Sequence, residues 1–401
     1  MTEATAGVQL KVRSKDLAEA IKACKAIMGR GAARPMFRHL HLVGHTLVAT
    51  DGPNMVSVQL PTWGQDGEPM EQTVPIPVAI TNAMPKGEVT FAVFHEDDGW
   101  LVTVGNASWT MPDTEGTILA PEFLRAYDPR TKQGTISGKS LAMILDLAKP
   151  AVADPNYARP LLAGLEFSPH HCTSTDGWGA ALLDWPIHVG DSGECPITGV
   201  VEHHALHRMW RALPKRVQAA DWTVFQTPQR VDLVAAGVHL SLPMMEGRFF
   251  AVRDLVPSSF PAWITLNRTA GEQLLEACQT IANVNDAPYA VTLKVQGGQL
   301  HVTAASVAAA QVSLDLPLLD HCDAEVTQRP ESGPETRTGM MLTEFGVPFH
   351  AKKLGEMLAR VLAGDLLVRI ELVHTNAIAR LRVNDHAAYV LMPLRSEDGW
   401  A

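Results

Sequence analysis

A short pattern occurs three times in this sequence, at intervals of about one domain. In the clearest copy, residues 162–187, an apolar run leads into Thr175-Asp176-Gly177 and a second apolar run follows. Residues 47–61 repeat this order around Thr50-Asp51-Gly52, and residues 300–317 keep the runs but lack the Asp-Gly pair. Apolar runs on both sides of an Asp-Gly pair predict a β-hairpin with a short turn.

The spacing of the three copies predicts the domain organisation. The equivalent threonines at positions 50, 175 and 303 lie 125 and 128 residues apart, which is far longer than a solenoid repeat and close to the length of one domain. The 401 residues are therefore predicted to form three copies of one domain, at 1–129, 130–260 and 261–401. The third copy has a polar insertion at about 320–340, expected to be a surface loop or a disordered segment, and ends in the short tail 396–401.

Within each copy the sequence predicts the order β-α-β-β-β-α-β-β-β, give or take one strand. Four of the longer helices are expected at 15–28, 139–148, 202–213 and 351–362. Ser14 is expected to be the N-cap of the first of them. Helices combined with hairpin-connected strands indicate an α+β fold with antiparallel sheets.

Composition limits the compartment and the class of partner. The first residues lack the apolar core of a signal peptide, and no run approaches the ~18 apolar residues of a membrane span, so we expect a cytoplasmic protein without membrane contact. The five cysteines form no CxxC pair and are expected to be reduced. A net charge of −10 argues against a DNA partner unless the positive charges gather on one surface.

Three passages, in their order and spacing, carry a resemblance to a known family. They are the Thr175-Asp176-Gly177 hairpin, Glu246-Gly247-Arg248-Phe249 with Val256-Pro257 after it, and residues 388–395. Over essentially its whole length the sequence resembles the bacterial β sliding clamp, the DNA polymerase III β subunit that gives the replicative polymerase its processivity. The resemblance implies that each domain places two helices inside and antiparallel sheets outside.

The resemblance also implies an assembly and a set of partners. Two chains would close head to tail into a homodimeric ring around duplex DNA, with an edge strand of domain one against domain three of the partner. Trp109 and Met111 share one face of the matching strand. The protein would have no active site, cofactor or metal. Its partners would be duplex DNA bound without sequence preference, a DNA polymerase and the clamp loader.

Positive charges recur on or beside the equivalent predicted helices. In a ring they would face phosphate while the acidic residues face solvent, so the net charge does not exclude DNA. For any one of these residues, an ordinary solvated helix face is the alternative. The candidate DNA-binding residues are Lys15, Lys22, Lys25, Lys139, Lys149, Arg208, Arg211, Lys215, Arg216, Lys352 and Arg360.

A second surface implied by the resemblance is a hydrophobic cleft between the second and third domains, where sliding clamps bind short peptides of their partners. The family usually has His-Arg-Leu where this chain has Trp178-Gly179-Ala180, a proline in place of Phe250, and an asparagine and a tyrosine in place of His350 and Lys353. A tail residue, Trp400, could fold back into this cleft; a frayed tail is the alternative. Carried over position by position, the cleft residues are Leu162, Thr175, Gly177, Trp178, Gly179, Ala180, Phe250, Leu255, His350, Lys353, Val390, Met392, Pro393, Leu394 and Arg395.

Two patterns are typical of other functions. Residues 134–140, GTISGKS, resemble a phosphate loop but place three residues rather than four between the glycines. His203 and His207, beside His204, lie four apart on one predicted helix and could bind a metal, although Glu202 does not complete an H-E-x-x-H pattern. The alternatives to a clamp are therefore a clamp-like interaction protein without ring closure, which competes for clamp-binding peptides, and a metal-dependent enzyme.

Overall fold

The structure is a computed structural model that describes residues 5–28, 34–61, 65–66, 73–78, 80, 86–96, 99–112, 132–188, 193–282, 290–305, 311–328, 337–364, 366–375 and 377–394. It divides into two compact units, the first comprising 1–143 with 195–246 and the second 144–194 with 247–401. The described residues form helices and antiparallel strands, so the predicted α+β class is confirmed. The predicted second domain, 130–260, is shared between the two units, and the bounds of the three domains stay a prediction.

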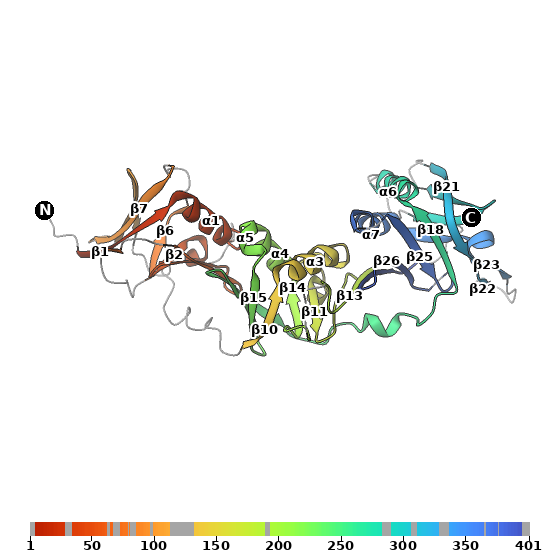
Figure 1. Ribbon diagram of the computed structural model, residues 1–401, viewed down its shortest axis with the longest axis horizontal. Coiled ribbons are helices and arrows are strands. Elements are labelled where there is room, and N and C mark those ends of the chain that lie inside the picture. Colours follow the sequence, from red (N-terminus) through yellow and green to blue (C-terminus); the bar gives the residue numbers. More distant parts are fainter. Residues whose placement is uncertain are drawn as a thin grey trace. The chain divides into compact units, whose positions relative to one another are not determined.

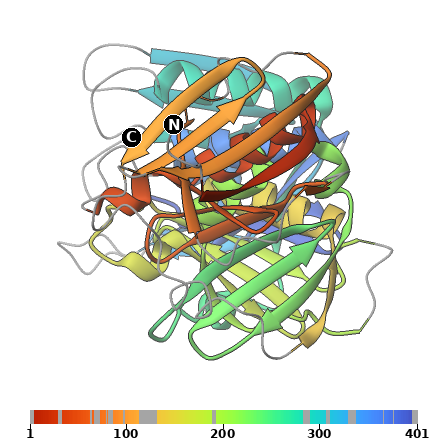
Figure 2. The ribbon, with the colours of Figure 1, turned by 90° about the vertical axis from the view of Figure 1, so that its left-hand side faces the viewer.

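The first unit contains a five-stranded antiparallel sheet in the order β5-β1-β7-β8-β9. The red strand β1 and the orange strand β7 lie side by side in Figures 1 and 2. The strands are β1 (Thr5–Arg13), β5 (Gln65–Asp66), β7 (Glu88–Glu96), β8 (Gly99–Val104) and β9 (Ala107–Pro112).

Helix α1 (Ser14–Lys25) follows β1 and packs against strands of both sheets of this unit. Its apolar stripe, Leu17, Ile21 and Cys24, is buried, because residues at this spacing fall on one face of a helix. The expected N-cap was wrong, since Arg13 occupies that position. Ser14 lies inside the helix, and its backbone N–H and Oγ both donate to the carbonyl oxygen of Gly87 (2.8 and 2.9 Å).

The second sheet of this unit joins strands of the first two repeats, in the pairing order β6-β2-β3-β4-β17-β16-β15-β10, with β14 also on β17. The 3-10 helix η1 (Pro35–Arg38) precedes it, α4 (His203–Ala212) and α5 (Lys215–Gln218) follow β14, and the boundary between the units falls within α3 (Gly138–Ala148). The strands are β2 (Leu40–Val43), β3 (Thr46–Thr50), β4 (Met55–Gln59), β6 (Thr73–Ile76), β10 (Lys132–Ser137), β14 (Gly199–Glu202), β15 (Asp221–Gln226), β16 (Arg230–Ala235) and β17 (Val238–Met245).

The second unit is built from the pairing order β11-β12-β13-β27-β26-β25-β18-β21-β20-β19-β24. Helices α6 (Arg268–Ala282) and α7 (Ala351–Gly364) lie side by side and pack on strands of the third repeat, α6 on β18, β20, β21 and β25 and α7 on β24 to β27 (Figure 1). The short helices are η3 (Lys149–Ala151), η4 (Pro160–Ala163), η5 (Val252–Leu255) and the π-helix η6 (Met341–Phe345). The strands are β11 (Gly164–Ser168), β12 (His171–Thr175), β13 (Gly179–Asp184), β18 (Ala262–Asn267), β19 (Ala290–Gln296), β20 (Gln299–Ala305), β21 (Gln311–Cys322), β24 (Val347–His350), β25 (Leu367–Leu372), β26 (Ala379–Asn384) and β27 (Ala387–Leu391).

The same strand pairing recurs three times along the chain. Each repeat has an inner meander (β2-β3-β4, β11-β12-β13, β19-β20-β21) and an outer meander (β7-β8-β9, β15-β16-β17, β25-β26-β27). The first strand of each repeat pairs with the first strand of its outer meander, as in β1–β7, β10–β15 and β18–β25. The repeat detected in the sequence is thus present in the backbone hydrogen bonding.

The two Asp-Gly turns are alike at the level of single atoms. Thr50 Oγ1 donates to the carbonyl of Asn54 (2.7 Å), and Thr175 Oγ1 donates to the carbonyl of Gly179 (2.8 Å). In each turn the aspartate Oδ1 accepts from the backbone N–H three residues later, at 2.9 Å. The turn glycines have φ of +107° and +90°, the left-handed region that favours glycine.

The insertion at about 320–340 is not a loop throughout, so that expectation was wrong for its described part. Residues 320–322 continue β21, and β22 (Glu325–Gln328) pairs with β23 (Arg337–Met340). The Asp323 carboxylate fixes both ends of this hairpin, since Oδ1 accepts from the N–H groups of Ala324 and Leu342 (2.9 and 2.8 Å). Its Oδ2 accepts from the backbone N–H and Oγ1 of Thr343 (3.0 and 2.8 Å). Because polar residues of the insertion cap its own hairpin, its composition resembles that of a loop.

All five cysteines are free, as expected from their number and spacing. Cys24, Cys172, Cys195 and Cys278 are buried, and Cys322 is partly buried. Burial raises the pKa of the Cys278 thiol to about 12, so this cysteine stays protonated and packs as a small apolar residue.

Candidate functional site

An apolar pocket in the second unit collects large side chains that remain exposed. Trp178, Phe250, Leu255 and Met392 are 51%, 56%, 52% and 44% exposed, which is unusual for residues of this size in one place. The lining residues are Thr175, Gly177, Trp178, Gly179, Ala180, Phe250, Val252, Leu255, Ile378, Val390, Leu391 and Met392. The pocket can accommodate apolar side chains of another molecule.

Pairing of β13 with β27 brings the two main walls together. Gly179 lies opposite Leu391 in the register, and the N–H of Met392 donates to the carbonyl of Trp178 (3.2 Å). A Cβ at Gly179 would lie 2.6 Å from Met357 Cε and 3.0 Å from the Val390 carbonyl oxygen. A side chain at this position would displace Met357 and crowd the Val390 carbonyl, so glycine favours the close approach of the two strands.

Nine of the fifteen predicted cleft residues line this pocket, and five others lie in the described part of the same unit. Leu162 is buried, with its Cδ1 4.0 Å from the position of a Cβ on Gly177. Pro393 is buried, and the N–H of Leu394 donates to the carbonyl of Pro348 (2.9 Å). Arg395 lies outside the described residues. The pocket also contains three residues that the prediction missed, Val252, Ile378 and Leu391.

A buried ion pair holds the turn of β12–β13 against helix α7. Lys353 Nζ lies 2.5 Å from Asp176 Oδ2 and 3.3 Å from Glu356 Oε2, and it donates to the carbonyl of Pro150 (3.1 Å). Burial disfavours the charge on Lys353, but Asp176 and Glu356 outweigh that effect and raise its pKa above the ordinary value. Lys353, a predicted cleft residue, therefore fixes the rim of the pocket, and its charge is paired with Asp176 and Glu356.

His350 extends the aromatic surface of the cleft. Its ring centroid lies 5.8 Å from that of Trp178, at an interplanar angle of 58°. Burial, followed by the charge of Lys353, lowers the pKa of His350. The imidazole is therefore held neutral around pH 7 and packs as part of an apolar wall.

A cationic concavity lies between α1 and α4 in the first unit. It is lined by Lys22, Lys25, His207, Arg208 and Arg211, together with two alanines. The four lysine and arginine side chains are exposed, and Arg208 Nη2 lies 3.8 Å from Asp51 Oδ2. Helices separated by about 180 residues thus place four predicted DNA-binding residues on one surface, which could hold an anionic chain.

The remaining predicted DNA-binding residues differ in how far their charge is offset. Arg360 donates to both carboxylate oxygens of Asp146 (2.6 and 2.7 Å). Both contacts come from Nη1, and this charge-assisted pair offsets much of the positive charge that Arg360 could offer to a phosphate. The exposed residues on or beside the helices are Lys15, Lys139, Lys149, Lys215 and Lys352.

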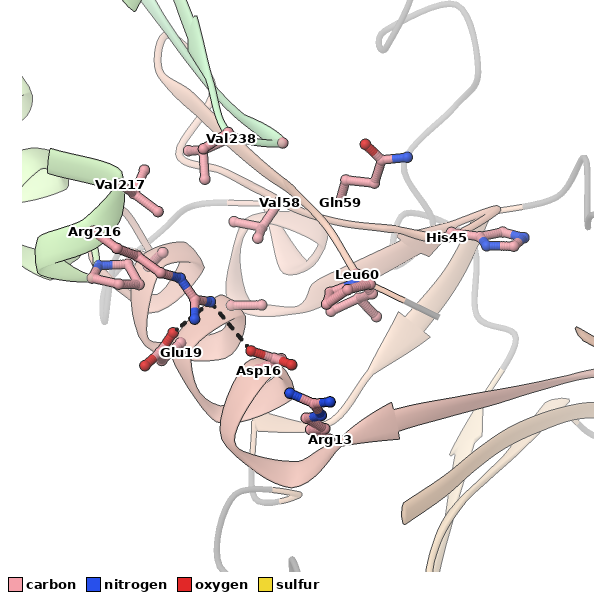
Figure 3. A pocket seen from close by; sticks show the side chains of 16 residues that line it. Arg13, Asp16, Glu19, His45, Val58, Gln59, Leu60, Arg216, Val217 and Val238 are labelled. Carbon is pink, nitrogen blue, oxygen red and sulfur yellow. Dashed lines mark hydrogen bonds and ion pairs between the residues drawn. The ribbon is translucent and has the colours of Figure 1, made fainter. Parts of the chain in front are cut away.

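Arg216 lies in a different pocket of the first unit, between α1, α5 and the ends of β4 and β17. Figure 3 shows its side chain reaching from α5 toward the start of α1. Its Nη2 lies 3.2 Å from Asp16 Oδ1 and 3.0 Å from Glu19 Oε2. Two carboxylates around one guanidinium join the two helices and offset the positive charge of Arg216.

Strand β9 forms the edge of its sheet in the described part of the first unit. Its Trp109 and Met111 lie opposite Val102 and Trp100 of β8, both buried. Trp109 and Met111 share one face and are themselves only partly buried. Half-covered apolar side chains on an edge strand are typical of a strand that a partner completes.

The two patterns typical of other functions have structural explanations. A Cβ at Gly138 would lie 1.8 Å from the carbonyl oxygen of Gln218 and 2.7 Å from that of Ala220, and such oxygens repel a phosphate.

The ring of His203 stacks on that of His207, with the ring centroids 5.2 Å apart and an interplanar angle of 13°. Among the residues described, no group of three or more His, Cys, Asp or Glu is placed to hold a metal. None of the described helices is both long and apolar enough to span a membrane.

Comparisons with known proteins identify the fold. No family model matches the chain, and no curated protein matches its sequence. The DNA polymerase III β subunit of Pseudomonas aeruginosa is 18% identical, with a TM-score of 0.74 over 96% of this chain and 100% of that one. The sliding clamp of Bacillus subtilis is 13% identical, with a TM-score of 0.75 over 98% and 100%. A P. aeruginosa sliding clamp bound to griselimycin is 19% identical, with a TM-score of 0.73 over 97% and 100%. This chain has the fold of these proteins along nearly its whole length.

Proposed function

We propose that this chain is a DNA sliding clamp, which encircles duplex DNA as a homodimeric ring and tethers a DNA polymerase to it. The protein would be non-catalytic and cytoplasmic. Its function would be mechanical, because a closed ring keeps its partner on DNA without tight or specific binding. The clamp loader and other replication or repair proteins would be further partners.

The observation that carries this proposal is the strand pairing that joins successive repeats. The last strand of one inner meander pairs with the last outer strand of the next repeat, as in β4–β17 and β13–β27. Two strands in equivalent positions have no such partner within the described residues. They are β21, the last inner strand of the third repeat, and β9, the last outer strand of the first repeat. Pairing of β21 in one chain with β9 in a second chain would continue the series and close a two-fold ring.

Two surfaces supply the other requirements of a clamp. The concavity formed by Lys22, Lys25, Arg208 and Arg211 carries positive charge without groups arranged to recognise bases, which suits sequence-independent contact with phosphate. The apolar cleft around Trp178 would bind short peptides of the polymerase and the loader. Binding of DNA and of partners would therefore use separate parts of the chain.

Ring closure can be tested by light scattering of the purified protein. We expect a mass twice the 43.4 kDa of the chain, and a monomer for the variant with Trp109→Glu and Met111→Glu. Because both side chains are partly buried, circular dichroism must show that the variant is folded. Trp178→Glu is the matched control, since it places a charge in the cleft and should leave the dimer intact. A dimer that survives the double substitution would place the interface elsewhere.

A clamp-like interaction protein without ring closure is the second candidate, because the cleft is built within one chain. It predicts a monomer at all concentrations and normal peptide binding. A primer-extension assay on circular DNA separates the two: a clamp lengthens the products made in one binding event, whereas an open competitor shortens them.

A further inference from the structure

We propose that the apolar cleft continues into an arginine-lined pocket, and that the preferred partner peptides carry acidic residues next to their apolar anchor. The inference rests on the proposed function, because it assumes that the cleft binds peptides. It concerns the sheet formed by β13, β27, β26 and β25, on the face that carries Arg380 and Arg382.

One apolar cluster connects the two pockets. It consists of Ala180, Leu182, Val252, Ile378 and Val390, with Val256 packed against it. Four of its residues line the cleft, whereas Leu182 and Val256 line the second pocket. The second pocket, called here the arginine pocket, also contains Arg253, Arg380, Arg382 and Asn384. A peptide anchored in the cleft can therefore extend over continuous apolar surface to the arginines.

The arginines are held in place by a buried carboxylate. Glu371 is 5% exposed and lies 2.5 Å from Arg380 Nε, 3.1 Å from Arg369 Nε and 3.3 Å from Arg382 Nε. Arg380 also stacks over the ring of Phe260 at 4.2 Å. One carboxylate cannot neutralise three guanidinium groups, so the cluster around Glu371 carries more positive than negative charge.

The acidic residues of the arginine pocket leave part of this charge free. Asp184 accepts from Arg253 Nη1 (2.7 Å), and Arg253 also donates to the carbonyl of Leu183 (3.1 Å), so these two side chains are engaged with each other and with β13. Asp385 is exposed at the β26–β27 turn. Arg382 is 52% exposed and presents its remaining N–H groups to solvent, where an incoming anion can reach them.

The chemistry of the site suits a side-chain carboxylate. A guanidinium presents donors in a fork that matches the two oxygens of aspartate or glutamate. A preorganised arginine loses less conformational freedom on binding than a free one. The apolar cleft would then supply affinity, and the arginine pocket would distinguish acidic peptides from neutral or basic ones.

Synthetic peptides with one apolar core, Leu-Ser-Leu-Phe, and four-residue flanks test the proposal with the full-length protein. The flanks are all serine, all aspartate or all lysine, on either side of the core. We expect aspartate on one side to tighten binding by about tenfold over serine at low salt, lysine to weaken it, and the difference to shrink at high salt.

Substitutions identify the site. Arg382→Gln should reduce the preference for aspartate by about fivefold, and Asp385→Asn should increase it, whereas Arg268→Gln, an exposed arginine on α6, should change nothing. Glu371 retains two partners in Arg382→Gln, so the fold is preserved. Equal affinity for all flanks, or a preference unchanged in Arg382→Gln, would overturn this inference and leave the cleft intact. Failure of every peptide to bind would overturn the peptide-binding cleft as well.

Discussion

The cationic concavity between α1 and α4 permits a quantitative test of DNA contact. The variant replaces Lys22, Lys25, Arg208 and Arg211, which line the concavity, with glutamine. Three of these residues take part in no ion pair with described residues, and the Arg208–Asp51 contact of 3.8 Å is half-exposed. Exposed pairs of this kind contribute about 0–1 kcal/mol to stability, so the variant should fold normally.

The expected effect follows from counterion release. Each side chain that neutralises a phosphate contributes about 0.9 to the slope of log affinity against log salt. Four lost contacts should therefore flatten the slope by about 3 to 4 units. Between 50 and 200 mM salt, this corresponds to roughly a hundredfold smaller loss of affinity.

Fluorescence anisotropy on a short linear duplex measures this slope, because an open-ended DNA needs no clamp loader. A control variant with the same change in net charge replaces Arg159, Arg248, Arg268 and Lys294, none of which lines the concavity. The reasoning is refuted if the quadruple variant keeps the original slope. It is also refuted if the control flattens the slope equally, because the effect would then reflect overall charge and not this surface.

Three further expectations concern stability and the cleft. Burial lowers the pKa of His41 to about 4, although its Nε2 contacts the Met36 carbonyl at 2.9 Å. As the pH falls below about 6.5, the unfolded chain therefore takes up a proton at His41 before the folded chain does. Urea titrations should show that the free energy of unfolding falls by about 3 kcal/mol more between pH 7 and pH 4 in the original protein than in His41→Gln. Lys353→Met should cost about 3 kcal/mol, because it leaves the Asp176 carboxylate buried without its cation, and most of that loss should be recovered when Asp176→Asn is added. Met392→Ala should weaken binding of an apolar peptide by about tenfold in a titration, and unchanged affinity would contradict the cleft assignment.

Local patterns made most of the fold predictable. The hairpins around the two Asp-Gly turns, the long helices and the three-fold repeat depend on neighbouring residues and on periodicity, which a sequence displays directly. Ser14 was misassigned because its hydrogen-bond partner, Gly87, lies 73 residues away. The hairpin of β22 and β23 was missed because Asp323 supplies its caps from outside the strands.

The candidate cleft was largely predictable by resemblance, but the arginine pocket was not. Arg380 and Arg382 alternate with Leu381 on β26, which indicates one outward face of a strand. Nothing in that local pattern shows that Arg253, 127 residues earlier, lies in the same pocket, or that Glu371 holds the pair together. Such convergence depends on the register of β13, β27 and β26, which is set by tertiary packing.

A comparison of the two Asp-Gly turns suggests why one junction has an open apolar cleft. Each turn aspartate faces a cation from the second helix of the next repeat, Asp51 with Arg208 of α4 and Asp176 with Lys353 of α7. At the first junction Arg230 donates to the carbonyl of Pro53 (3.0 Å) and so covers the turn. At the second junction Trp178 occupies the position that corresponds to Pro53, and it is half-exposed. The same backbone turn thus lies under an arginine at the first junction, whereas at the second junction it borders an open apolar pocket.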